Sequence, residues 1–464
     1  MSAHFRELFP SNKVIKFRTD FRNTIYDLFL HRKWELTTHE SEWNMCWSEK
    51  DWINEVYDSL SLRNNQYVNH FRNYYELTRK DLLAKNMKRL KKQQEKMKNE
   101  EELKLLDITP VTFVLPIEYK LFLEEYKRRG NRVWIMKPIG KSQGKGIFLF
   151  SKISQIKSWS VGRPAERSRA GAAAAAAEVA ERNRAAELAE RNNAVAAAEL
   201  EKPPEGDPSA ERPEQYIVQE YIPNPLLIGG KKFDIRLYVL IVCYSPLTIY
   251  LYRSGFARFA HTYFKNEKNH MTDVTMHLTN VSIQKNAEGY DDNVGGKWFV
   301  RELFLYMSSR YGYDRVMQLI GDIENCIIQS FLAVHKIIIN DRHCFELYGF
   351  DILIDSNLKP WLIEVNSSPS LSANTQEDYT LKFNMLDELM CLINLEQYPL
   401  PETDRVGDFD CIYRAGRRVL SPRPHNFFSR LGAQLSGTEH LKQMAKDIKR
   451  GMGTAGGPEK GGAP

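Results

Sequence analysis

Asp351, Glu364 and Asn366 form the strongest chemical signal in this sequence. Glu364 and Asn366 lie two positions apart in WLIEVNSSPS, so on a strand their side chains point the same way, and a neighbouring strand through YGFDILID can bring Asp351 alongside. Carboxylate and amide oxygens are hard ligands that Mg²⁺ takes while it also holds nucleotide phosphates. Because buried carboxylates are unfavourable without a cation, the pattern predicts a magnesium site. The alternative is a strand pair whose carboxylates lie at exposed ends.

A lysine followed by a glycine-containing loop forms the second signal. Lys137 ends the apolar run WIMKP, which would place a positive charge at the mouth of a cleft. Small residues in the following loop would let backbone N–H groups approach a phosphate. The loop spacing matches neither a Walker A motif nor GxGxxG, and glycine-containing hairpins are common. The candidate phosphate loop comprises Ser142, Gln143, Gly144, Lys145 and Gly146.

Three charged residues on one predicted strand form the third signal. Lys232, Asp234 and Arg236 alternate with apolar residues and so share one face, which indicates a polar cleft. A half-exposed strand with cross-strand ion pairs is the alternative. Arg258, in GFARFA, is suited to bidentate binding of a carboxylate or phosphate. We interpret His277, in HLTN, as a structural residue and not as a catalytic one.

Strands joined by short turns must position these residues. Runs of branched and aromatic residues alternate with turn residues, which is the pattern of strands. A hairpin would form around the glycine-containing loop, and Ser356-Asn357 would turn the chain between the last two strands. We expect strands at 133–136, 147–150, 216–221, 233–244, 248–252, 348–355 and 360–366, with a helical region at about 297–340.

Residues 13–130 have the pattern of a compact α/β region. We expect a strand at 14–17 and a helix at 23–30. A tryptophan cluster follows these elements. We predict that it packs in the core and does not form a binding groove, because indole rings bury a large area. The cluster consists of Trp34, Trp43, Trp47 and Trp52.

A basic helix is predicted at 79–98. The apolar residues of its first half share one face, as in a helix that packs on a core, whereas its second half has almost no apolar face. This second half is either a solvated helix end or a basic surface for an acidic partner. The helix would present Leu82, Leu83, Met87 and Leu90 to the core, and Lys88, Arg89, Lys91 and Lys92 to a partner.

Two segments lack the composition of a folded core. Residues at about 161–213 are rich in Ala, Glu and Arg and end in PPEG, which indicates a low-complexity insertion between two strands that is dispensable for chemistry. After about residue 421 the chain becomes rich in Gly, Lys and Pro. We predict that its end, GMGTAGGPEKGGAP, is disordered.

The composition of the whole chain indicates a soluble intracellular protein. Of its 464 residues 42% are hydrophobic, and its net charge is +6. The six cysteines show no CxxC or zinc-finger spacing and are interpreted as reduced thiols. The first thirty residues contain no uninterrupted apolar segment of the secretory type. The most apolar stretch, 238–252, is shorter than the roughly 20 residues of a membrane-spanning helix and contains Ser245-Pro246.

Taken together, these segments resemble the tubulin tyrosine ligase-like family. They occur in the family's order across about residues 65–375, and the set is far more specific than any single motif. The N-terminal tryptophans make the chain look most like the ciliary glutamylase branch. The Ala-rich insertion and the C-terminal tail have no counterpart in the family. The matching segments are LTRKDLLAKNMKR, WIMKP, SQGKGI, VQEYIPNPLLIGGKKFDIRLYVL, YLYRSGFARFA, HLTNVSIQK, LYGFDILID and WLIEVNSSPSL.

The resemblance implies an α/β (α+β) fold of the ATP-grasp type, with ATP held between two α/β lobes. A smaller N-terminal α/β region, 1–130, would precede the catalytic region at 131–400, which the Ala-rich insertion interrupts. Residues 401–464 would form a C-terminal extension that is disordered toward its end.

The resemblance also implies site residues by position. Arg236 and Arg258 would stabilise the γ-phosphate and the acyl phosphate made from it, and Lys80 would lie near the phosphate or substrate end. The metal ligands would be Asp351, Glu364 and Asn366. The cofactor-binding residues would be Lys137 and Lys232 at the phosphates, Gln219, Glu220, Tyr221 and Ile222 at the adenine, and Ser142, Gln143, Gly144, Lys145, Gly146, Asp234 and Asn280.

The activity implied by the resemblance is ATP- and Mg²⁺-dependent addition of glutamate to glutamate side chains of tubulin C-terminal tails. Tubulin or microtubules and free glutamate would be its partners, with accessory subunits possible and with no nucleic acid or membrane. It would work in the cytoplasm and cytoskeleton, at a ciliary or flagellar axoneme or basal body. The alternatives are addition of glycine or tyrosine, or a non-catalytic microtubule-binding protein. Nucleic-acid binding is a weaker alternative, since the lysine run lacks interleaved aromatic residues.

Overall fold

The computed structural model of the chain describes most of the regions that carry these signals. The segment at 161–213 and the residues 455–464 at the end of the tail lie outside the described part, so the predictions made for them stay predictions. The described residues are 8–9, 13–159, 215–265, 270–285, 296–373, 375–400, 403–419, 431–432 and 437–454.

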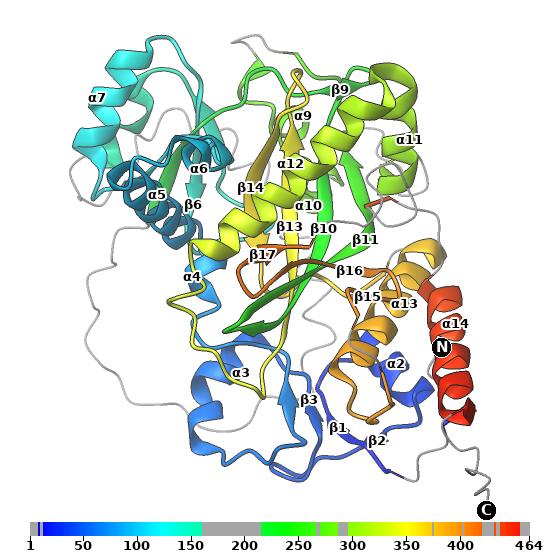
Figure 1. Cartoon of the computed structure of the whole chain (residues 1–464). Coiled ribbons are helices and arrows are strands. Elements are labelled where there is room, and N and C mark those ends of the chain that lie inside the picture. Colours follow the sequence, from blue (N-terminus) through cyan, green and yellow to red (C-terminus); the bar gives the residue numbers. More distant parts are fainter. Residues whose placement is uncertain are drawn as a thin grey trace, which may run out of the picture.

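A large, mostly antiparallel sheet forms the centre of the molecule (Figure 1). Its strands are rich in branched and aromatic residues, and short turns at Ser245-Pro246 and Ser356-Asn357 join consecutive partners. Strands β9, β12 and β17 pair along its margins. The order is β14 (Pro360–Asn366), β13 (Glu346–Ile354), β10 (Lys231–Tyr244), β11 (Leu247–Phe259), β16 (Phe409–Arg414) and β15 (Arg405–Val406), with β9 (Leu227–Ile228), β12 (Lys297–Phe299) and β17 (Arg417–Arg418) at the margins.

Strand β11 is longer than the sequence pattern predicted. The expected strand ended at residue 252, but pairing with β10 continues to Phe259 and so includes Arg258. The extension requires Gly255, because a Cβ atom at this position would collide with the carbonyl oxygen of Arg236 on β10. Gly255 is therefore a point of close approach between the two strands.

A second antiparallel sheet lies beside the first. The predicted hairpin around the glycine-containing loop is its β6–β7 pair. Helix α7 (Tyr119–Arg129) covers it, with Phe122 packed edge-to-face on Trp134. Because β5 and α7 precede residue 130, the predicted boundary at that residue runs through this layer. The order is β5 (Thr112–Leu115), β8 (Tyr216–Glu220), β6 (Trp134–Pro138) and β7 (Phe148–Phe150).

A third, small sheet of parallel strands lies near the N-terminus. Helix α2 (Thr24–His31), expected at 23–30, follows its first strand and is capped by the side chain of Asn23. The strands are β1 (Lys16–Arg18), β2 (Glu35–Leu36), β3 (Met45–Cys46) and β4 (Tyr67–Val68), and the short helices α3 (Lys50–Glu55) and η1 (Tyr57–Ser59) separate the last two.

The tryptophan cluster belongs to the core, as predicted. Trp34, Trp43 and Trp47 are buried, and Trp52 packs edge-to-face on Trp43 with ring centroids 6.3 Å apart. None of the six cysteines, all of them among the described residues, forms a disulfide. Within the described ranges, no helix has both the length and the apolar character to cross a membrane.

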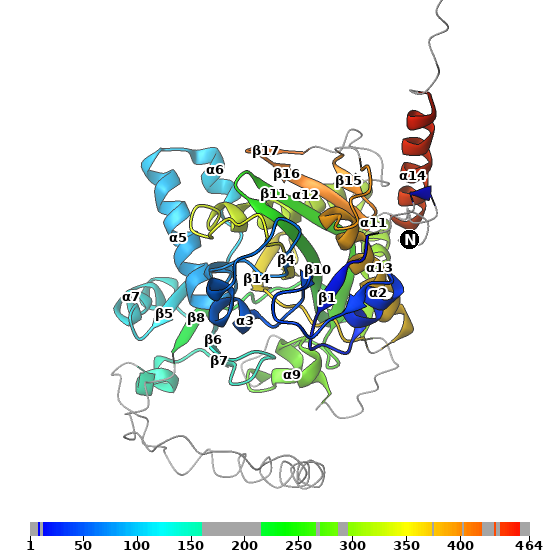
Figure 2. The same cartoon turned by 90° about the horizontal axis from the view of Figure 1, so that it is seen from below.

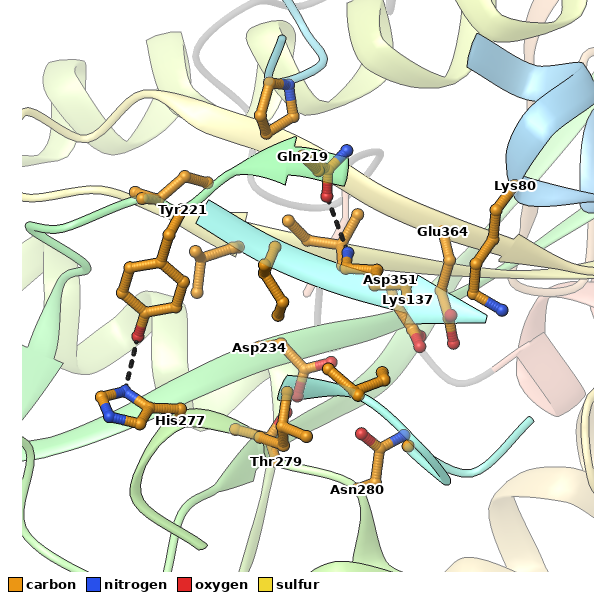
Figure 3. Close-up of a pocket in the computed structure, with 18 of the residues that line it drawn as sticks. Lys80, Lys137, Gln219, Tyr221, Asp234, His277, Thr279, Asn280, Asp351 and Glu364 are labelled. Carbon is orange, nitrogen blue, oxygen red and sulfur yellow. Dashed lines mark hydrogen bonds between the residues drawn. The ribbon is translucent and has the colours of Figure 1, made fainter. Parts of the chain in front are cut away.

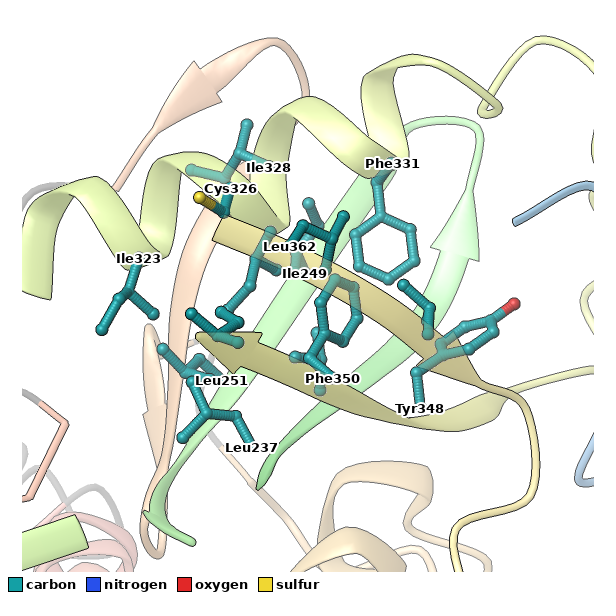
Figure 4. Close-up of a cluster of buried hydrophobic side chains, with 14 of the residues drawn as sticks. Leu237, Ile249, Leu251, Ile323, Cys326, Ile328, Phe331, Tyr348, Phe350 and Leu362 are labelled. Atoms are coloured by element: carbon teal, nitrogen blue, oxygen red, sulfur yellow. The ribbon is translucent and has the colours of Figure 1, made fainter. Parts of the chain in front are cut away.

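Helix α12 (Tyr313–Leu332) crosses one face of the large sheet (Figure 1). The predicted helical region at 297–340 consists of β12, helix α11 (Val300–Tyr311) and α12, with a break at Gly312, whose φ is +88°. Under α12, Phe331 and Cys326 contact an apolar cluster from four strands that includes Leu237, Phe350 and Leu362 (Figure 4). This cluster packs α12 against one face of the large sheet.

The predicted basic helix is α5 (Lys80–Lys96), which follows α4 (Tyr75–Thr78) and precedes α6 (Glu100–Leu105). Leu83 and Met87 are buried, Leu82 and Leu90 are half-buried, and the second half of the helix is mostly exposed. The helix therefore has the core-facing half and the solvated half that its sequence indicates.

The tail contains a helix that the composition did not predict. Helix α14 (Gly437–Thr454) includes the first four residues of the GMGTAGGPEKGGAP segment, so the prediction of disorder is wrong for 451–454. Leu441, Met444 and Ala445 pack against Cys391 of α13 (Gln376–Ile393) and against Val406. Figure 2 shows α14 beside α13, on the opposite side of the molecule from α5 and α7. The apolar face of α14 is covered by tertiary contacts, which composition alone does not reveal.

Candidate functional site

A pocket lies between the second sheet and the large sheet, on the side of the large sheet that α12 does not cover. Strands β6 and β8 form one wall, and β10, β11, β13 and β14 form the other (Figure 3). The short helices α9 (Val274–His277) and α10 (Val281–Gln284) flank it. The residues predicted from sequence that line it are Lys80, Lys137, Ser142, Gln143, Gly144, Gln219, Glu220, Tyr221, Ile222, Lys232, Asp234, Arg258, Asn280, Asp351 and Glu364.

Strand register brings the predicted acidic residues together. Asp351 on β13 pairs directly with Glu364 on β14 and with Arg236 on β10. A bulge follows the Asp351–Glu364 pair, and the amide of Asn366 lies 3.4 Å from the Glu364 carboxylate. The shared face of Glu364 and Asn366, with Asp351 alongside, is therefore as the sequence predicted.

Two arginines neutralise one of the two carboxylates. Arg236 binds Asp351 through both carboxylate oxygens, and Arg258 Nη2 lies 2.9 Å from the same group. Burial opposes ionisation of Asp351, but the two guanidinium charges outweigh it and hold its pKa below the usual value. Arg258 also pairs with Asp234, its cross-strand neighbour. These three strands thus carry a connected ion-pair network.

No arginine in the described ranges pairs with Glu364 in this way. Burial, together with the negative charge of Asp351, raises its pKa above the usual value. Among the described residues no group of three or more His, Cys, Asp or Glu side chains could hold a metal alone. Mg²⁺ commonly uses one or two carboxylates together with substrate phosphates, so Asp351, Glu364 and Asn366 fit that requirement.

Two buried lysines face the pocket from its two walls. Lys137 Nζ donates to Gln219 Oε1 at 2.7 Å, and Lys232 Nζ donates to the carbonyl oxygen of His277 at 2.7 Å (Figure 3 labels Lys137, Gln219 and His277). Burial lowers the pKa of Lys137 to about 8 and that of Lys232 to about 7. The phenolic oxygen of Tyr221 lies 3.3 Å from Lys232 Nζ. A bound anion would restore the charge of both lysines.

The glycine-containing loop closes one side of the pocket. Gly144 has φ +78°, and a Cβ atom there would collide with Ile283, so this position needs glycine. Ser282 donates to the carbonyl oxygen of Gln143 at 2.9 Å, and Lys80 donates to that of Lys141 at 3.1 Å. The loop is thereby tied to both α10 and α5.

Four predicted residues do not line this pocket. Lys145 and Gly146 lie in the same loop but are exposed outside the lining. Arg236 is joined to the pocket through its ion pair with Asp351, and Asn366 lines a neighbouring cavity that also includes Ser142. The structure therefore brings most of the predicted set together but separates these four from the cleft itself.

The apolar part of the pocket lining was not predicted from the sequence. Ile135 lies two positions before Lys137, and Leu353 lies two after Asp351, so strand alternation could have placed both in the pocket. His277, which we interpreted as structural, lines the pocket, and its Nδ1 lies 2.9 Å from the hydroxyl of Tyr221. Burial lowers the pKa of His277. The remaining missed residues are Pro110, Lys141, Ile147, Leu278, Thr279 and Ile363.

Comparisons with known proteins identify the class of this chain. The model of the tubulin-tyrosine ligase family matches residues 59–404, and the chain belongs to that family. Membership indicates an ATP-dependent ligase.

Three relatives illustrate the branch. The probable tubulin polyglutamylase TTLL9 of Bos taurus is 41% identical over 87% of this chain and 84% of its own length. The probable tubulin polyglutamylase ttll-9 of Caenorhabditis elegans is 36% identical over 88% and 87%. The probable alpha-tubulin polyglutamylase Ttll1 of Tetrahymena thermophila is 38% identical over 87% and 94%.

Proposed function

We propose that the chain is an ATP- and Mg²⁺-dependent carboxylate–amine ligase of the ATP-grasp type that adds glutamate to glutamate side chains of tubulin C-terminal tails. One observation carries the proposal most directly: the adjacent carboxylates of Asp351 and Glu364 share a pocket with two buried lysines, between two sheets. The names of the relatives, tubulin polyglutamylases at 36–41% identity, supply the reaction and the acceptor.

The reaction requires activation of a carboxylate. An amine does not displace hydroxide from a carboxylate at neutral pH, because hydroxide is a poor leaving group. Transfer of the γ-phosphoryl group of ATP to the acceptor carboxylate gives an acyl phosphate and ADP. The amine of glutamate then attacks the acyl carbon, and phosphate leaves as the isopeptide bond forms. Both steps place negative charge at one point, so the site needs a high density of cations.

The side chains around the pocket fit the parts of this reaction. Lys137 and Lys232 would bind phosphate oxygens, and this binding would favour their charged forms, which burial disfavours by holding their pKa values near 8 and 7. Arg258 would bind the transferred phosphoryl group, and Arg236 would orient Asp351. Lys80 and Asn280 would bind at the substrate end. Bound Mg²⁺ would supply charge stabilisation at the phosphates, held by Asp351, Glu364 and Asn366.

The other end of the pocket suits an adenine ring. Residues Gln219 to Ile222 line one edge of this end, and Ile135, Leu278 and Leu353 offer apolar faces. The side chain of Gln219 is held between Lys137 and Thr112, which fixes this edge. Gly144, with Ser142 and Gln143, would cover the phosphates from the loop side.

Tubulin or microtubules and free glutamate are the proposed partners, with accessory subunits possible. The proposed location is the cytoplasm and cytoskeleton, at a ciliary or flagellar axoneme or basal body. The relatives' names support the tubulin part of this proposal, and the resemblance to the ciliary branch supports the location.

The test is incubation of the protein with ATP, Mg²⁺ and tubulin, with labelled glutamate, glycine and tyrosine in separate reactions. Label from glutamate alone should enter the tubulin tails, only when ATP and Mg²⁺ are present, and mass spectrometry should place it on glutamate side chains. Incorporation of glycine or tyrosine in its place would contradict the amino-acid assignment. Failure of all three would contradict the proposed ligase.

A further inference from the structure

A groove opens from the catalytic pocket onto the surface between α5 and strands β5 and β8. It shares Lys80, Gln219 and Glu364 with the pocket, so the two are continuous. Figure 3 shows Lys80, on α5, next to Glu364 at one end of the pocket, and Figure 1 shows α5 beside the second sheet. The groove therefore connects the proposed reaction centre with the exposed half of α5.

Three lysines line this groove from a single helix. Lys80 lies at its inner end, and Lys88 and Lys91 lie further out. At 3.6 residues per turn, Lys91 follows Lys80 by about three turns and lies almost on the same line, with roughly 16 Å between the two positions along the axis. This line of lysines leads to the carboxylate of Glu364.

The other cations of α5 point elsewhere. Arg89 lies about two and a half turns after Lys80, on the opposite face, where it donates to the carbonyl oxygen of Ala333 at 2.6 Å. Lys85 and Lys92 are exposed, and neither lines the groove. The basic residues of α5 therefore form two groups, those that line the groove and those that point away from it.

A carboxylate already lies against one of the groove's cations. Lys88 Nζ is 2.7 Å from Glu118 Oε2, and Glu118 also accepts from the backbone N–H of Val114. The side chain of Lys88 is 42% exposed in this pair, which leaves room for a second acceptor. The floor between the lysines is apolar and includes Leu83 and Phe113. A chain with carboxylates toward α5 and aliphatic stems on this floor matches the lining.

We propose that the groove binds an acidic segment of the acceptor peptide, which runs from Lys91 inward to the carboxylate that reacts beside Lys80 and Glu364. This inference rests on the proposed function, because it places the acceptor of that reaction. An extended peptide advances about 3.3 Å per residue, so about five residues would span the lysine line. The groove would select acceptors with several acidic residues around the modified position.

Binding of a fluorescent hexaglutamate peptide to the full chain, measured by anisotropy at low salt, tests the proposal without requiring turnover. Lys88→Gln combined with Lys91→Gln should weaken binding by about tenfold, and Lys91→Gln alone by about threefold, because groove cations raise the local concentration of acidic ligands. Lys85→Gln combined with Lys92→Gln removes the same charge from the same helix and should change binding by less than about twofold.

Equal weakening by the two double variants, weakening by neither, or absence of binding to the unmodified chain would overturn the groove assignment. The two single variants Lys91→Gln and Lys92→Gln repeat the comparison without disturbing the ion pair between Lys88 and Glu118. A chain that binds the peptide through Lys91 but never transfers glutamate would contradict the proposed function alone. A chain that transfers glutamate but treats the two double variants alike would contradict this inference alone.

Discussion

The two faces of the large sheet use the same strands for opposite purposes. On β13, Phe350 and Ile352 point to α12 and are fully buried among apolar side chains, whereas the alternate residues Asp351 and Leu353 point to the pocket. Strand β10 shows the same division, with Ile235 beneath α12 and Asp234 in the pocket. Alternate residues of a single strand thus contribute to the hydrophobic core on one face and to the pocket on the other.

The comparison also separates two kinds of charge on the polar face. Asp234, Asp351, Arg236 and Arg258 pair with one another, so their charges are balanced before any ligand binds. Burial lowers the pKa values of Lys137 and Lys232 and raises that of Glu364, so it favours the neutral form of all three side chains. These groups regain charge when an ion of opposite sign binds, which agrees with the phosphate and metal roles proposed for them.

Phe350→Ala should have the largest effect on the fold. Phe350 is fully buried beneath α12, and removal of its ring would leave a cavity that lowers the free energy of unfolding by about 3–5 kcal/mol. Chemical denaturation measures this change. Leu305→Ala, at a side chain that is 48% exposed on α11, should change the same quantity by less than about 0.5 kcal/mol. Similar losses in the two variants would show that the α12 face is not the main support of the sheet.

Glu364→Gln should have the largest effect on activity with the fold retained. The change removes the carboxylate of the pair that no arginine neutralises within the described part of the chain, and we expect ligation to fall by at least about 100-fold. Unfolding temperature should stay close to that of the unmodified protein. Glu377→Gln, on the exposed first turn of α13, is the control and should remain fully active. A folded Glu364→Gln variant with normal activity would refute the metal assignment.

Affinity for Mg·ATP should depend on pH through the two buried lysines. Above pH 7–8 the free protein holds Lys232 and then Lys137 neutral, so each must take up a proton before it can bind phosphate. Affinity should therefore fall as pH rises from 7 to 9, by up to about tenfold per lysine per pH unit. Calorimetry in buffers of different ionisation enthalpy should show proton uptake.

Lys232→Arg provides the control for this pH dependence. A guanidinium group stays charged throughout the range, so the slope of affinity against pH should become shallower. Affinity that is flat with pH in the unmodified protein, or proton release on binding, would contradict the assignment of both lysines.

Deletion of residues 165–210 should have the smallest effect. The composition of this segment predicts a low-complexity insertion, and the flanking strands β7 and β8 both belong to the second sheet without it. We expect the ATP-dependent ligation rate to stay within about twofold of that of the full chain. A truncated chain that folds, as judged by circular dichroism, yet has lost activity would show that the segment shapes the site.

Sequence periodicity predicted the strands of the site because each charged residue stands in an alternating apolar run. Asp351, Glu364 and Lys232 could be placed on common faces in this way. Their partners could not, because the pairing of Arg236 with Asp351 depends on the register between strands that are distant in sequence. Helix α14 escaped prediction for a similar reason, since its apolar face is explained only by contacts such as that of Leu441 with α13.

The measurement that tests the account most directly is the stabilisation of the protein by Mg·ATP. For the unmodified chain, saturating Mg·ATP should raise the unfolding temperature, because a ligand that binds only the folded state adds about 4 kcal/mol at 1,000 times its Kd. Without ligand, Lys232→Gln should unfold at the same temperature as the unmodified chain, because burial disfavours the charged form of the lysine that it replaces. With saturating Mg·ATP, it should lose most of the rise in unfolding temperature. A rise of equal size in Lys232→Gln would contradict the assignment of this pocket as the nucleotide site.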